Sequence, residues 1–339
     1  MKVVFAARPA CNHQGVVAKI LRISMGVEPR CGMMMQGLDS MRAYFELTKP
    51  RITWLILMST GIGYWFGLPP GWSVQNLLHT LLGTALLASG TAVLNQWYER
   101  DVDALMRRTR GRPLPAGRVR AGCALAFGAV LSAGGFFELW LAVNPLSAWL
   151  GLFTLGSYLL LYTPLKRRSP VCTTVGAFSG AMPPLIGYAA AAGHLTAQAW
   201  VLYGILFLWQ FPHFLSIAWI YREDYGRGGI AMLPVVRPEG VETARQILIA
   251  SLLLIPLSLA PAFIGMSGRL YLVAALGLGL VYFGASLRLA RVRSMPRARQ
   301  LLLTSVVYLP LLYALALLDS GLAHRSVSTL AALVVAVLK

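Results

Sequence analysis

Charged residues are scarce in this sequence. Only 12% of its 339 residues are Asp, Glu, Lys or Arg, and 57% are hydrophobic, whereas soluble globular proteins carry about 25% charged residues. This composition excludes a water-soluble enzyme, and it also excludes a disordered chain, which would be poor in apolar residues. The four cysteines show no CxxC spacing, so neither a zinc site nor a disulfide framework is indicated.

Two further patterns are missing from the sequence. It has no glycine-rich phosphate loop, so a nucleotide is not the obvious ligand. Its apolar segments show no alternation with a period of two, which disfavours a β-barrel. Leu, Ala and Gly dominate these segments, and the mean hydropathy is +0.64. The sequence therefore predicts an all-α fold, namely a polytopic membrane helical bundle.

Nine apolar stretches approach the length of about 20 residues that a membrane-spanning helix needs. They cover roughly residues 52–68, 77–97, 121–142, 145–163, 171–191, 198–220, 246–266, 269–290 and 300–318. Turn residues such as Asn144 and Pro145 separate them. Very few residues join the third and fourth stretches, which predicts a tight helical hairpin. We predict a nine-helix membrane domain over residues 41–320.

The two ends of the chain differ from this domain. Residues 1–40 are basic and contain no apolar core long enough for a signal peptide, so we expect a disordered basic N-terminal extension. Residues 321–339 form a C-terminal tail. Its apolar part is only about 12 residues long, too short to cross a membrane.

Basic residues are abundant and unevenly distributed. The net charge is +18, which on a soluble protein would suggest a nucleic-acid partner. Here 22 Lys and Arg residues lie in alternate loops of the nine-span topology and only three on the opposite side. Because cytoplasmic loops carry the excess of positive charge, we predict a multi-pass protein of the cell (inner) membrane with a cytoplasmic N-terminus and no nucleic-acid partner.

The few acidic residues cluster after two of the predicted spans. Glu99, Asp101 and Asp103 follow the second span, and Glu223 and Asp224 follow the sixth. Asn95, Glu99 and Asp103 are spaced four residues apart, so a helix places them along one face about 6 Å apart. Three oxygen-bearing side chains on one stripe make half of a site for a hard cation. Asp101 points away from that stripe.

The second acidic segment predicts a facing stripe, because Tyr221 lies three residues before Asp224. Carboxylates repel phosphate, but Mg²⁺ held between them bridges phosphate oxygens, and Arg112, Lys166 and Arg167 offer cations for the remaining oxygens. We predict a magnesium–diphosphate site at the cytoplasmic membrane face, for a diphosphate with a lipid tail. The competing interpretation is that these acids only neutralise nearby Arg residues or cap helix ends.

Five segments in order resemble the UbiA-type intramembrane prenyltransferases and, within that superfamily, the branch that farnesylates protohaem IX. They are residues 94–115 (LNQWYERDVDALMRRTRGRPLP), 47–51 (LTKPR), 162–167 (YTPLKR), 209–214 (WQFPHF), and 221–225 (YREDY) with 229–234 (GIAMLP). The likeness covers residues from about 40 to 320. Any one segment alone would be a weak signal, whereas five in order are a strong one.

The resemblance implies roles for particular residues. Asn95, Glu99 and Asp103 resemble the first metal–diphosphate motif, and Asp224 resembles the main acid of the second. The superfamily often has Asp in place of Glu99, and other members carry further acids where this chain has Tyr221 and Tyr225. The implied catalytic residues are Asn95, Glu99, Asp103, Asp224 and Lys166, of which all but Lys166 would be metal ligands. The implied substrate-binding residues are Arg107, Arg112, Arg167, His213, Tyr221, Arg222 and Tyr225.

The resemblance also implies a reaction. A farnesyl group would pass from farnesyl diphosphate to a vinyl group of haem b, with Mg²⁺ as cofactor, giving haem O and diphosphate. The implied partners are the two substrates, the lipid bilayer, and a downstream haem A synthase or terminal oxidase assembly. His213 lies about 16 Å deeper in its helix than Asp224, where it would hold the haem iron or a propionate, or else form an interhelical hydrogen bond.

Three alternative functions are weighed at this stage. A structural subunit that only binds haem would not need two acidic stripes with Arg and Lys. A prenyltransferase acting on a quinone or chlorophyll precursor would use the same site with a different cavity. A membrane transporter would also bury acids, but near mid-membrane, whereas these acids lie at one face.

Overall fold

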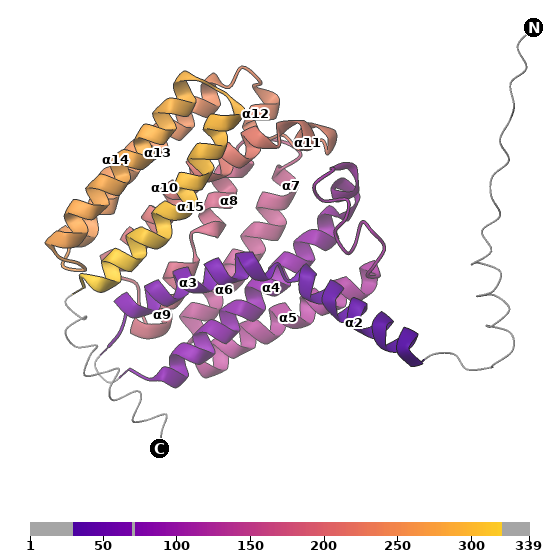
Figure 1. Ribbon diagram of the computed structural model, residues 1–339. Coiled ribbons are helices and arrows are strands. Elements are labelled where there is room, and N and C mark those ends of the chain that lie inside the picture. Colours follow the sequence, from indigo (N-terminus) through magenta and orange to yellow (C-terminus); the bar gives the residue numbers. More distant parts are fainter. Residues whose placement is uncertain (1–29, 70–71, 321–339) are drawn as a thin grey trace, which may run out of the picture. The chain divides into compact units, whose positions relative to one another are not determined.

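The computed structural model describes residues 30–69 and 72–320, and these contain helices but no strand. The chain divides into two units, Met1–Arg42 and Ala43–Lys339. The helices of Figure 1 are α2 (Arg30–Leu47), α3 (Pro50–Phe66), α4 (Val74–Leu105), α5 (Ala121–Ala142), α6 (Pro145–Gly156), the π-helix η1 (Ser157–Tyr162), α7 (Thr163–Leu165), α8 (Cys172–Gly180), α9 (Pro183–Ala192), α10 (Ala197–Ile220), α11 (Arg222–Arg227), α12 (Leu233–Val236), α13 (Val241–Phe263), α14 (Arg269–Arg291) and α15 (Met295–Leu318). The predicted tail 321–339 and most of the predicted extension 1–40 lie outside the described residues, and α2 begins within that extension.

Within residues 30–69 and 72–320, seven helices are long and apolar enough to cross a membrane, counting Pro145–Leu165 as one. The other two predicted spans are not among these seven. The stretch 52–68 becomes α3, whose 17 residues match the predicted length and lie at the short end of the range for a crossing helix. The stretch 171–191 is broken between α8 and α9, because Pro183 and Pro184 lack the amide hydrogens that would continue the helix. The all-α membrane bundle is confirmed, whereas the count of nine spans and the orientation stay predictions.

The predicted hairpin between the third and fourth spans is present. Only Val143 and Asn144 separate α5 from α6. The Asn144 side chain accepts a hydrogen bond from the Ser147 amide at 2.9 Å, capping α6. It also donates to the Ala189 carbonyl at 2.8 Å, which ties the hairpin to α9.

Helices α3 and α9 pack backbone against backbone. A Cβ atom at Gly63 would collide with the Pro184 carbonyl, and one at Gly187 would collide with the Thr60 carbonyl. Glycine is therefore required on both sides of this contact. Such close approach is a common means of packing helices in membranes, where small residues let backbones come together.

The C-terminal helices α10, α13, α14 and α15 pack on one another, and Figure 1 shows α13, α14 and α15 side by side. Buried tyrosines join them. The Tyr282 and Tyr308 rings stack with centroids 4.9 Å apart, and the Tyr308 hydroxyl is 2.7 Å from the Ser258 hydroxyl. These polar groups satisfy one another within the apolar bundle.

Helix α4 extends well past its apolar part. Its 32 residues span about 48 Å, whereas the hydrocarbon core of a bilayer is about 30 Å thick. The apolar stretch ends near Trp97, so the last two turns, with Glu99 and Asp103, lie beyond it. This length brings the acidic stripe to the end of the bundle.

Candidate active site

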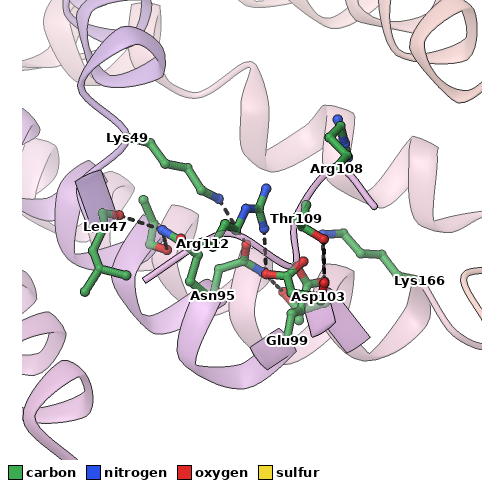
Figure 2. Close-up of polar contacts among 12 residues, drawn as sticks. Leu47, Lys49, Asn95, Glu99, Asp103, Arg108, Thr109, Arg112 and Lys166 are labelled. Carbon is green, nitrogen blue, oxygen red and sulfur yellow. Dashed lines mark hydrogen bonds and ion pairs between the residues drawn. The ribbon is translucent and has the colours of Figure 1, made fainter. Parts of the chain in front are cut away.

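A small polar cavity of about 90 Å³ lies at the C-terminal end of α4. It collects side chains from α4, the α2–α3 turn, the loop after α4, the η1–α7 segment and the region from α11 to α12. Its lining residues are Lys49, Asn95, Glu99, Asp103, Met106, Arg108, Arg112, Tyr158, Tyr162, Lys166, Tyr225, Ile230 and Met232. Figure 2 shows Lys49, Arg112 and Lys166 converging on the α4 stripe from different segments.

Each member of the α4 stripe has a cationic partner. The Glu99 carboxylate lies 2.8 Å from the Lys166 ammonium, and both side chains are nearly buried. The Asp103 carboxylate is 1% exposed and lies 2.6 Å from the Arg112 guanidinium. Asn95 Oδ1 accepts a hydrogen bond from Lys49 Nζ at 3.4 Å. The stripe thus faces a set of side-chain cations, as a site for a metal–anion pair requires.

Lys49 reaches the cavity from an unusual backbone conformation. With φ 49° and ψ 59° it is the only non-glycine residue with positive φ among the described residues. It precedes Pro50, and a following proline disfavours the right-handed helical region. Burial lowers the pKa of Lys49 to about 7, and the charges of Arg112 and Lys166 add to this shift.

The π-helical turn η1 aligns an aromatic wall with Lys166. Tyr158 and Tyr162 have ring centroids 4.8 Å apart, and the Lys166 ammonium lies 4.4 Å from the Tyr162 centroid. Burial lowers the pKa of Lys166, but Tyr162 and Glu99 raise it more, so its pKa lies above its ordinary value and the ammonium stays charged. Short π-helical turns are frequent at functional sites.

The loop after α4 folds back over the stripe. The buried Thr109 hydroxyl donates to the Asp103 carbonyl at 2.8 Å. This turn carries Arg108 and Arg112 to the cavity wall, whereas the Arg107 side chain is exposed and does not line the cavity.

Asp224 is buried but does not line the cavity. Its carboxylate accepts hydrogen bonds from the backbone amides of Arg107 at 3.0 Å and Arg108 at 2.9 Å. It also pairs with Arg227 at 2.8 Å. Burial raises the pKa of Asp224, but the two amides and the Arg227 guanidinium lower it more, so the carboxyl has a pKa below its usual value. The role of Asp224 as a metal ligand stays a prediction.

The other predicted binding residues fall into two groups. Tyr225 lines the cavity. Tyr221 lies beneath the Arg108 guanidinium, whose central carbon is 4.8 Å from the centroid of the Tyr221 ring. Arg167 is exposed and does not line the cavity, and Arg222 stacks on Trp219 at 4.8 Å instead. Their roles in substrate binding stay predictions.

His213 lies within α10, apart from the cavity lining. Its Nδ1 is 2.8 Å from the Ser305 hydroxyl, and its ring stacks on Trp209 with centroids 4.6 Å apart. The interhelical hydrogen bond is therefore present. The role of His213 toward haem stays a prediction.

The predicted site residues leave out the polar lining residues Lys49, Arg108 and Tyr162 and the apolar ones Met106, Ile230 and Met232, while Tyr158 was expected only as one of several aromatic candidates. Lys49 lies in one of the five resembling segments and precedes a proline, so a signal was available. Tyr158, Tyr162 and Lys166 are spaced four residues apart, like the α4 stripe. Arg108 had no signal that separates it from its neighbour Arg107.

The lining residues fit a magnesium–diphosphate pair. Two carboxylates and one amide oxygen are hard ligands, and Mg²⁺ binds through one or two carboxylates with water and substrate phosphates. Among residues 30–69 and 72–320, no group of three His, Cys, Asp or Glu is placed to hold a metal by itself. The residues that would hold Mg²⁺ are thus Asn95, Glu99 and Asp103, completed by ligand oxygens.

Fold and cavity together define a polytopic helical membrane protein in which carboxylates and side-chain cations share one cavity. Comparison with known proteins identifies the family: residues 56–307 match the UbiA prenyltransferase family. A protoheme IX farnesyltransferase of Solibacter usitatus (strain Ellin6076) is 65% identical over 288 residues, which cover 82% of this chain and 99% of that protein. This chain belongs to the UbiA prenyltransferase family, so it is a prenyltransferase and not the transporter considered above.

Several solved structures share the fold. One, described as a digeranylgeranylglyceryl phosphate synthase in membranes, has a TM-score of 0.71 at 16% identity and covers 83% of this chain and 99% of that chain. Another is a UbiA homologue from Archaeoglobus fulgidus bound to GPP and Mg²⁺, with a TM-score of 0.59 at 19% identity, covering 81% and 99%.

Proposed function

We propose that this protein transfers a farnesyl group from farnesyl diphosphate to a vinyl group of haem b, giving haem O and diphosphate. The observation that carries the proposal is the α4 cavity, in which two carboxylates and an amide face four side-chain cations. The 65% identity to a protoheme IX farnesyltransferase supports haem as the acceptor over a quinone or chlorophyll precursor.

The cations of the cavity hold the diphosphate end of the donor. Lys49, Arg112 and Lys166 each lie against an oxygen of the α4 stripe, and they turn to the diphosphate when it enters. Negative charge grows on the diphosphate as the allylic C–O bond breaks, and fixed cations stabilise it where it develops. Mg²⁺, when bound by Asn95, Glu99 and Asp103, supplies further positive charge to the same oxygens.

The farnesyl carbon becomes cationic as the bond breaks. The Tyr158 and Tyr162 rings line the cavity beside Lys166, and aromatic faces attract cations. Water must be kept from this carbocation until the vinyl group attacks it. The new C–C bond leaves a cation beside the porphyrin, which adds water and releases a proton.

We further propose a topology for this chemistry. Nine crossings, with α3 and the α8–α9 pair as the two short ones, put the N-terminus and the active site on the cytoplasmic side. The strong bias of Lys and Arg to one set of loops supports this orientation. Haem O leaves as the substrate of a downstream haem A synthase or terminal oxidase assembly.

The test is mass spectrometry of haem extracted after incubation. Purified protein in detergent receives haem b, farnesyl diphosphate and Mg²⁺, and we expect a product whose mass has increased by one farnesyl group and one hydroxyl group. A parallel reaction contains EDTA, and another replaces haem b with a hydroxybenzoate acceptor. Product in the hydroxybenzoate reaction, with none from haem b, would assign the protein to a different prenyl acceptor.

A further inference from the structure

Three residues contact the loop after α4: Tyr221, which directly precedes α11, and two residues within that helix. Tyr221, Asp224 and Tyr225 occupy positions i, i+3 and i+4, which a helix brings together. All three touch Arg108. The Asp224 carboxylate accepts hydrogen bonds from the backbone amides of Arg107 and Arg108, so this side chain helps to hold the Arg108 main chain in place.

The Arg108 side chain is held by the two tyrosines. Its guanidinium carbon lies 4.8 Å from the Tyr221 ring centroid and 5.4 Å from the Tyr225 centroid. It donates one hydrogen bond, to the Tyr225 hydroxyl at 3.2 Å. Arg108 forms no ion pair within the part of the chain that the structure describes, in contrast to Arg112 and Lys166.

Tyrosines suit this task better than carboxylates. A second acid on α11 would pair with Arg108 and neutralise it, whereas an aromatic face holds a guanidinium by cation–π contact and leaves most of its N–H donors available. Those donors match the oxygens of a phosphate. Related sequences were expected to carry further acids at positions 221 and 225. The need to hold Arg108 without neutralising it explains why this chain has tyrosines there.

We propose that Tyr221, Asp224 and Tyr225 form a clamp that holds Arg108 at the cavity wall as a diphosphate-binding residue. In this arrangement Asp224 is a positioning residue and not a metal ligand. Two amides and Arg227 take up its carboxylate, and it does not line the cavity. The identity of the bound diphosphate rests on the proposed function, but the clamp itself does not.

Hydrogen–deuterium exchange tests the clamp without substrate. Protein in detergent with EDTA is compared as wild type, Asp224→Asn and Asp224→Ala, with Asp101→Asn as the matched control because Asp101 is an exposed acid of α4. We expect exchange at the amides of Arg107 and Arg108 to rise in Asp224→Asn, to rise further in Asp224→Ala, and to stay unchanged in Asp101→Asn. Unchanged exchange in both Asp224 variants overturns the clamp.

Kinetics separates positioning from metal binding. Arg108→Ala should raise the KM for farnesyl diphosphate about tenfold, the size expected for one charge-assisted hydrogen bond. Asp224→Asn should raise the same KM several-fold while leaving the half-saturating Mg²⁺ concentration, measured at saturating donor, unchanged. Asp103→Asn should raise that Mg²⁺ concentration. An equal increase in Asp224→Asn would make Asp224 a metal ligand and overturn the proposal.

A double variant keeps the test decisive if Asp224→Ala fails to fold. Residues that act as a unit show non-additive effects. Because Asp224 acts through Arg108, the KM of Arg108→Ala/Asp224→Asn should equal that of Arg108→Ala alone. Additive increases would mean that Asp224 acts independently of Arg108. Failure of haem farnesylation in the wild type would refute the proposed acceptor while the exchange result still reports on the clamp.

Discussion

Two short acidic segments of this protein look alike in sequence and differ in their partners. At the end of α4, Glu99 and Asp103 face side-chain cations across a cavity. In α11, Asp224 accepts hydrogen bonds from two backbone amides of the neighbouring loop and pairs with Arg227 of its own helix. A lysine or arginine side chain can turn from a carboxylate to an entering phosphate, whereas a backbone amide cannot leave without unfolding its loop. The first segment is therefore suited to ligand exchange and the second to support.

The pairing in the first segment also explains how acids and bases coexist in a nearly buried site. Removing one partner of a buried ion pair costs about 3–5 kcal/mol, because the other charge is left uncompensated. A metal ion bound alone would leave the Lys and Arg side chains without their carboxylate partners. A diphosphate bound alone would leave the carboxylates without their cationic partners. The two together replace both partners at once, so we expect them to bind cooperatively.

The largest effect is expected at Asp103, which tests whether the α4 segment carries the chemistry. Asp103→Ala removes a proposed metal ligand and strands Arg112, so farnesyl transfer should fall at least about 100-fold. The measurement is the rate of haem O formation by mass spectrometry. The matched control, Asp101→Ala on the outer face of α4, should stay close to wild type. Equal losses in both variants would mean that α4 acids matter only for folding.

Lys166 tests the cation side of the same segment. Lys166→Met removes a charge that stabilises the leaving diphosphate, and kcat should fall about 100-fold, measured as diphosphate release. Arg168→Ala removes an exposed cation two residues away that does not line the cavity. It should change kcat by less than about twofold. A larger loss in Arg168→Ala than in Lys166→Met would contradict the assignment of the cavity.

His213 tests whether haem is bound apart from both acidic segments. His213→Ala should lower haem affinity about tenfold, as expected for loss of one strong polar contact, and should leave donor KM unchanged. The measurement is a haem titration by absorbance. Ser305→Ala removes the hydrogen bond to His213 but keeps the imidazole, and should have a smaller effect. Unchanged haem affinity in His213→Ala would leave this residue a packing group of α10.

The smallest effect is expected at Tyr225 and sharpens the account of the second segment. Tyr225→Phe removes one hydroxyl hydrogen bond to Arg108 and keeps the ring beneath the guanidinium. Donor KM should rise only about two- to threefold, the size of one exposed hydrogen bond. The control Tyr98→Phe changes an exposed tyrosine of α4 that does not line the cavity and should have no effect. A loss of kcat in Tyr225→Phe would instead give its hydroxyl a part in the reaction.

Periodicity predicted the first segment well, because helical geometry is local. Asn95, Glu99 and Asp103 are four residues apart, and they line one cavity as a single face of α4 requires. The apolar stretches likewise predicted an all-α membrane bundle. Pro183 and Pro184 could have predicted the break between α8 and α9. The high average hydropathy of the stretch favoured a single continuous span instead.

The partners of Asp224 and the approach of Lys49 were beyond such reasoning. Both depend on contacts between segments far apart in the chain, 117 residues in the case of Asp224 and Arg107. Sequence spacing cannot tell whether a carboxylate meets a metal, a cation or a backbone amide. Only the fold of the loop after α4 decides that Arg108 and not Arg107 faces the cavity.

The contact between α3 and α9 has a consequence for biogenesis. Helices α3 and α9 are each short for a stable crossing. Gly63 of α3 lies against the backbone of α9, and Gly187 of α9 lies against the backbone of α3. The translocon therefore receives α3 long before the ribosome has made the segment that secures it. Truncated nascent chains that end before α9 should leave α3 loosely anchored, so maturation of this enzyme depends on synthesis reaching its middle.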